Sequence, residues 1–175
     1  MQQHFKEIQD KTHELYDIAK QARAKGYDPK SIVEISLATN LAQRAMALVG
    51  TMYPQVNNEK VEARIRELEK EYGFLDHAVC LKIAEEIAKE KFCKFQSLIE
   101  AIDAGIRVAF AYYTLGVVVP PLEGFTHYEL RKTKKGEDYW AAFFSGPIRS
   151  AGTTAAAFAV VIIDYLRNMF GYAKY

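Results

Sequence analysis

Apolar residues recur at helical spacing through about the first 115 residues, and this periodicity constrains the fold more than any other feature. Its stripes begin near side chains that can cap a helix and stop near glycines. They predict five helices: about 3–25, 37–49 and 59–72, one that begins after Asp76, and one that opens at the Ser97–Glu100 capping box and ends near Leu115. A short β-prone piece, residues 32–35, lies between the first two helices.

The pattern changes after Gly116. Residues 117–124 (VVVPPLEG) contain two prolines and are expected to be extended. Two β-prone runs follow, about 125–133 and 138–144, and the turn between them contains Gly136, which can adopt a positive φ. We therefore expect a β-hairpin. Its second strand is apolar on both faces, which is typical of a covered strand.

A last helix is predicted over about 153–170. Its residues 160–163 (VVII) point in every direction around the helix axis, so we expect it to be buried on most sides. The fold class is therefore α+β and mainly helical. We expect a helical region over 1–116, followed over 117–175 by the hairpin, a glycine-rich loop and the buried helix, which together resemble the start of a larger, truncated domain.

Composition excludes several classes of protein. With 50% apolar and 26% charged residues the chain is not globally disordered, and a net charge of +1 gives no general attraction to nucleic acid. Two cysteines predict reduced thiols in an intracellular protein. The N-terminus has no secretory signal, and the longest apolar run, residues 155–163, is far shorter than the ~20 residues that span a bilayer. We expect a cytoplasmic protein that does not enter membranes.

The loop between the second strand and the last helix has the composition of an anion site. Glycines let backbone N–H groups approach an oxyanion, free N–H groups lie at a helix start, and an arginine can donate two parallel hydrogen bonds to a phosphate. The candidate residues are Gly146, Arg149, Ser150, Gly152, Thr153 and Thr154. The alternative is a tight structural turn, in which Ser150 or Thr153 caps the helix and Arg149 pairs with a carboxylate.

Basic residues gather around the predicted hairpin turn. They are Arg131, Lys132, Lys134 and Lys135. Aromatic residues lie nearby, and basic side chains beside aromatic ones suit a nucleic-acid backbone and its bases. The alternative is a solvated turn with a core tryptophan, since Glu137 and Asp138 dilute the charge.

Catalytic chemistry has no convincing residues in this chain. The histidines are scattered, no Asp-x-Asp pair is present, and no nucleophile, base and orienting group occur together. We therefore predict no catalytic residue, no metal ligand and no cofactor here.

Several motifs resemble the N-terminal region of the large subunit of the archaeal D-family DNA polymerases. The most specific are residues 120–124 (PPLEG) and the run 139–167, which contains GPIRSAG. Residues 19–29 with 33–50, and 64–73 with 81–87, resemble earlier motifs of that family. One departure is Thr153, where the family usually has glycine; its β-carbon narrows the approach of an anion to the backbone.

This resemblance implies a parent of over a thousand residues that is a DNA-directed DNA polymerase. In that family the magnesium-binding aspartates lie far downstream, and a separate small subunit carries the 3′–5′ exonuclease. The chain would then be a scaffold that meets the small subunit and contacts the backbone of primer–template DNA. Two alternatives remain open: an interaction module whose amphipathic first helix binds the small subunit or a second copy, or a phosphate- or nucleotide-binding protein that uses the 146–154 loop.

Overall fold

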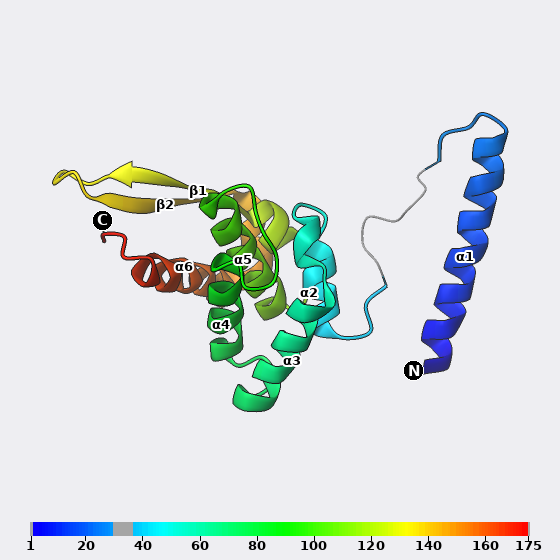
Figure 1. Ribbon diagram of the computed structural model, residues 1–175, viewed down its shortest axis with the longest axis horizontal. Coiled ribbons are helices and arrows are strands. Elements are labelled where there is room, and N and C mark those ends of the chain that lie inside the picture. The colour runs from blue at the N-terminus through cyan, green and yellow to red at the C-terminus, as the bar shows by residue number, and fades with distance from the viewer. Residues whose placement is uncertain (1, 30–36, 175) are drawn as a thin grey trace. The chain divides into compact units, whose positions relative to one another are not determined.

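The computed structural model describes residues 2–29 and 37–174, which form two compact units over residues 1–39 and 40–175 (Figure 1). The first unit contains α1 (Gln2–Ala24), and Gly26 follows it with a φ of +87°. This confirms the first predicted helix. The β-prone piece at 32–35 lies outside the described residues.

The second unit combines helices with one antiparallel hairpin, which confirms the mainly helical α+β class. Its elements are α2 (Leu41–Val49), the 3₁₀ turn η1 (Pro54–Val56), α3 (Glu59–Tyr72), α4 (His77–Ala88), α5 (Leu98–Tyr113), the π-helical turn η2 (Pro120–Gly124), β1 (Phe125–Lys132), β2 (Asp138–Phe144), the 3₁₀ helix η3 (Gly146–Ala151) and α6 (Gly152–Met169). The sequence-based division at residue 116 falls inside this unit, because the hairpin and α6 share one hydrophobic core with α2–α5.

Polar caps fix where the helices begin. The side chains of Asn58, Asp76 and Ser97 accept hydrogen bonds from backbone N–H groups in the first turns of α3, α4 and α5, as predicted. The start of α2 was predicted wrongly, at residue 37. Asn40 caps this helix by accepting from the backbone N–H of Gln43 at 2.9 Å, so α2 begins four residues later.

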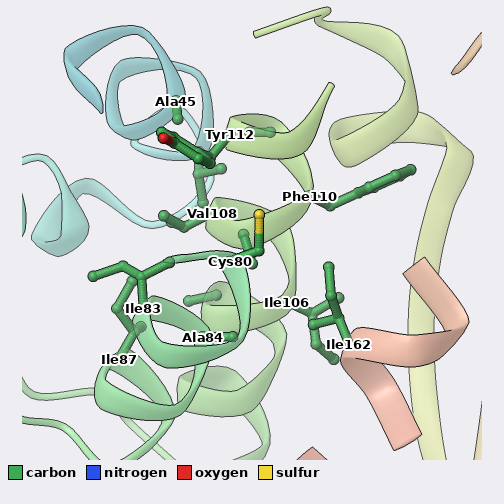
Figure 2. Packing of buried hydrophobic residues seen from close by; sticks show 14 of the residues in the cluster. Ala45, Cys80, Ile83, Ala84, Ile87, Ile106, Val108, Phe110, Tyr112 and Ile162 are labelled. Atoms are coloured by element: carbon green, nitrogen blue, oxygen red, sulfur yellow. The ribbon is translucent and has the colours of Figure 1, made fainter. Parts of the chain in front are cut away.

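The core is centred on the packing of α4 against α5 (Figure 2). Gly105 allows the close approach, because a β-carbon at this position would lie 2.6 Å from the carbonyl oxygen of Ala84. Cys80 lies fully buried in the same contact, and burial raises the pKa of its thiol to about 12. The thiol therefore stays protonated at neutral pH and acts as an apolar packing group.

Residues 117–124 were expected to be extended, and this expectation was wrong. Residues Pro120–Gly124 instead form a π-helical turn. Prolines suit the first turn of a helix, where a backbone N–H would have no partner inside the helix. The glycine-rich loop likewise forms the short 3₁₀ helix η3 rather than an irregular turn.

The hairpin pairs Phe125 with Phe144 at its base and Lys132 with Asp138 near its tip. Of the residues in β2 only Trp140 is buried, so the expectation of a covered strand was wrong. In the described part of the chain, α5 and η2 contact β1 and α6 contacts β2, and these contacts bury no residue of β2 other than Trp140.

Helix α6 packs against α4 and α5 through Phe158, Ile162 and Leu166. Its expected burial on most sides is also wrong, since Val160 and Val161 remain 53% and 49% exposed. The other elements of the unit cover only one side of the helix. Among the described residues, one helical stretch, 146–169, has the length and apolar composition of a helix that could cross a membrane.

Gly124 lies at a close approach of η2 to η3. A β-carbon there would lie 2.9 Å from both the Cα and the backbone N of Ile148. We expect Gly124→Ala to lower the free energy of unfolding by about 1–3 kcal/mol, because backbone must move to relieve the clash. Urea titration followed by circular dichroism measures the loss.

The matched control is Gly146→Ala, because a β-carbon at Gly146 meets no atom within 4 Å. This variant should stay within about 0.5 kcal/mol of the unmodified chain. Equal losses for the two variants would mean that the close approach of η2 and η3 does not limit stability.

Candidate functional site

Arg107 is the most highly connected side chain in the second unit. It projects from α5, is 2% exposed and donates to the carbonyl oxygens of Pro121 (2.7 Å), Leu122 (3.2 Å), Phe125 (2.8 Å) and Thr126 (2.6 Å). Its guanidinium also lies 4.9 Å from the centre of the Phe125 ring. One buried cation therefore holds η2 and the start of β1 against α5.

Asp103 balances the buried charge. Its carboxylate accepts from Arg107 Nε at 2.5 Å and from the Tyr53 hydroxyl at 2.9 Å. Burial, together with the negative charge of Asp103, raises the pKa of Tyr53 above its usual range. The tyrosine therefore remains a hydrogen-bond donor at neutral pH, and the ion pair gains a neutral third partner.

The two most specific sequence motifs lie side by side. Ser145 donates its backbone N–H to the carbonyl of Gly124 at 2.9 Å and its hydroxyl to the carbonyl of Glu123. With Ile148 packed on Gly124, these bonds tie the PPLEG turn to the GPIRSAG loop. Arg107 therefore positions the loop indirectly, through η2.

The candidate anion residues all lie on the surface. Gly146, Arg149, Ser150, Gly152, Thr153 and Thr154 are each exposed. The hydroxyl of Ser150 donates back to the carbonyl of Pro147 at 2.8 Å, and none of the described side chains caps α6. The guanidinium of Arg149 forms no hydrogen bond or ion pair with any residue in the described ranges, while its backbone carbonyl accepts from Gly152. The turn alternative, with a cap from Ser150 or Thr153 and a carboxylate on Arg149, is therefore not seen in this part of the chain.

The basic hairpin residues fall into two classes. Lys132 pairs with Asp138 at 2.8 Å, and Arg131 pairs with Glu129 at 2.9 Å while its guanidinium lies 5.0 Å from the Phe143 ring centre. Lys134 and Lys135 are exposed, and their ammonium groups pair with no acid of the described chain. The two lysines at the tip are thus the ones whose charge is available to a ligand.

A third lysine joins this tip. Lys174 lines a hollow of about 360 Å³ together with Lys134, Lys135, Thr133 and Glu137. The backbone N–H of Ala173 donates to the carbonyl of Asp138 at 2.9 Å, which brings the C-terminal residues beside β2. Sequence reasoning missed Lys174 because only this tertiary hydrogen bond places it there.

The structure separates the two candidate groups. The hairpin tip and the η3 loop lie at opposite ends of β2 (Figure 1). A strand of this length spans about 20 Å at ~3.3 Å per residue. The lysines and the loop are therefore two separate surface regions, and a single small ligand cannot contact both.

Sequence reasoning also missed Arg107 and Asp103. The available signal was their i, i+4 spacing inside an otherwise apolar helix, where a charged pair has to be buried. No cluster of three or more histidine, cysteine, aspartate or glutamate side chains that could hold a metal ion occurs over residues 2–29 and 37–174.

Comparison with known proteins identifies the family. Residues 3–175 match the family described as DNA polymerase II large subunit DP2, N-terminal. The chain belongs to this family. This confirms the resemblance that the GPIRSAG and PPLEG motifs suggested.

Individual relatives agree with this assignment. The DNA polymerase II large subunit of Nanoarchaeum equitans is 45% identical over 161 residues, which is 92% of this chain and 13% of that protein. Those of Methanococcus maripaludis (strain C5) and Pyrococcus furiosus are 41% and 37% identical over the whole chain. The chain spans only 13–15% of the length of these relatives.

We expect Arg107→Met to lower the free energy of unfolding by about 3–5 kcal/mol, because Asp103 is left as a buried, unpaired charge and four carbonyls lose their donor. The control Lys94→Met breaks an exposed pair with Glu90 and should cost less than about 1 kcal/mol. The double variant Arg107→Met/Asp103→Leu should recover part of the loss. Thermal and urea unfolding measure all three, and similar small losses for both single variants would contradict the role of Arg107.

Proposed function

We propose that this chain is a scaffold within the large subunit of a replicative archaeal D-family DNA polymerase, a cytoplasmic enzyme that synthesises DNA on a primer–template. The family match over residues 3–175 carries the proposal. The parent activity, its magnesium and the associated 3′–5′ exonuclease of the small subunit lie outside this chain. Among the side chains described here, no group of three or more His, Cys, Asp or Glu residues could hold a metal ion.

The scaffold role rests on how the second unit is built. Helices α2–α5 share one core, and Arg107 anchors both η2 and the base of the hairpin to it. A buried, hydrogen-bonded arginine holds the attached segments in a single arrangement. The hairpin and the loop therefore project from a rigid base, as a positioning element requires.

The same surfaces supply a contact to the DNA backbone. Lys134, Lys135 and Lys174 gather at the hairpin tip, and Arg149 in the loop pairs with no acid of the described chain. Duplex DNA carries one negative charge per ~1.7 Å of its axis, so two basic regions about 20 Å apart can meet separate phosphates of one duplex. A contact of this kind positions DNA without reading its sequence.

Subunit contact is a second role, which one observation favours. Within the first unit taken by itself, the apolar side chains of Leu15 and Ile18 on α1 are exposed along a stripe of helical spacing. An amphipathic helix with such a stripe is a common docking element. Its proposed partner is the small exonuclease subunit, and self-association is the alternative.

DNA titration tests the backbone contact. Two variants, Lys134→Ala/Lys135→Ala and separately Arg149→Ala, should weaken the binding of the protein to duplex DNA of any base sequence. For each phosphate that the variant no longer neutralises, the slope of log K against log salt concentration should fall in magnitude by about 0.9. Fluorescence anisotropy of labelled duplex between low and moderate salt measures both quantities.

The matched control is Lys89→Ala/Lys94→Ala, which removes two lysines that pair with Glu85 and Glu90. It should leave the slope unchanged. Binding that ignores salt, or that falls equally in the control, would exclude the DNA contact while leaving the scaffold role intact.

A further inference from the structure

The uncovered side of α6 forms an apolar surface flanked by two grooves. One groove, of about 550 Å³, lies between α6 and β2, and the other, of about 580 Å³, lies between α6 and Leu81 of α4. Val160 lines both grooves, and Val161 lines the second. We call this surface the α6 face; its apolar members are Leu81, Ala142, Phe144, Val160, Val161 and Ile163.

The sequence of α6 is that of a helix covered all round. Residues 160–163 are all branched apolar side chains, yet half of the surface of Val160 and of Val161 is exposed. A soluble protein normally buries a helix of this kind on every side. The α6 face therefore leaves apolar side chains exposed that a soluble protein normally covers.

Two residues that line the groove beside β2, Trp140 and Arg167, each contain a buried donor. Within the described chain, Trp140 Nε1 and Arg167 Nη2 are buried and have no hydrogen-bond partner. The rest of the Arg167 guanidinium is satisfied: Nε donates to Asp164 at 2.8 Å and Nη1 to the carbonyl of Tyr172. Both nitrogen atoms have almost no accessible surface, so a segment in the open groove could not bond to them directly, and other atoms of the groove are the ones available for contact.

The relatives indicate where such a segment comes from. This chain equals only 13–15% of their length, so most of each large subunit lies outside the matched region. Lys174 lines both grooves, which brings the C-terminal end of the described chain to the same face. A segment tethered there reaches the grooves at a high effective concentration, which favours it over a separate molecule.

We propose that the α6 face is the docking surface for polypeptide of the same large subunit that lies beyond the region matched here. The proposal rests on the assignment of this chain to a polymerase large subunit. The docked segment covers the exposed side chains of Val160 and Val161 with apolar side chains of its own.

Site-specific photo-crosslinking in the full-length large subunit, purified with its small subunit, tests this. A benzoylphenylalanine in place of Val160 should crosslink mainly to a peptide beyond residue 175 of the same polypeptide, as identified by mass spectrometry. The same probe in place of Glu129, which is exposed on the hairpin, is the control and should not capture that peptide. Crosslinks mainly to the small subunit or to an isotopically labelled second copy, or none at all, would overturn the proposal.

A second variant removes the dependence on one probe position. With the probe in place of Leu81, Val160→Asp should abolish the intramolecular crosslink, whereas Val160→Ala should retain most of it. Because Val160 is half exposed, neither change should prevent folding. Retention of the crosslink in the Val160→Asp variant would overturn the proposal. The proposal would also be overturned if the unmodified holoenzyme binds neutral phosphatidylcholine vesicles and the Val160→Asp variant does not.

The DNA polymerase activity of the labelled holoenzyme distinguishes a failure of the docking proposal from a failure of the proposed function. Active enzyme without the crosslink overturns only the docking proposal. Inactive preparations from an intact full-length chain, with or without the crosslink, would count against the proposed function instead.

Discussion

The buried pair of Arg107 and Asp103 is the interaction on which the second unit depends. An arginine offers five N–H donors in a fixed plane, and here they meet four backbone carbonyls and a carboxylate. Those carbonyls belong to the π-helical turn η2 and the first residues of β1, a segment where the chain changes from helix to strand. The backbone carbonyls of this segment are not all paired within a helix or a sheet, and Arg107 supplies hydrogen-bond donors for them. The chain can therefore change from helix to strand inside the core.

The rest of the hairpin region follows from that anchor. Arg107 fixes η2, Gly124 admits Ile148, and Ser145 closes the contact, so the GPIRSAG loop stands at the base of the hairpin with its polar side chains outward. The basic tip projects from the other end of β2 (Figure 1).

The sequence predicted local features better than tertiary ones. The starts of α3, α4 and α5 follow from single capping residues, which act within one turn. The η2 turn was missed because its geometry depends on Arg107, which is distant in sequence. Burial around α6 was overestimated because helical periodicity shows which faces are apolar but not what covers them. Of the candidate site, the exposure of Arg149 and the pairing of Lys132 could be known only from the structure.

Hydrogen–deuterium exchange on the Arg107→Met variant tests the central claim most directly. If Arg107 anchors the hairpin region, amides in residues 120–132 and 145–152 should exchange at least tenfold faster than in the unmodified chain, while those in α3 keep their protection. This follows because the rate at which a region opens depends on the interactions that hold that region closed. Uniformly faster exchange across the second unit, or unchanged exchange in η2 and β1, would contradict the account.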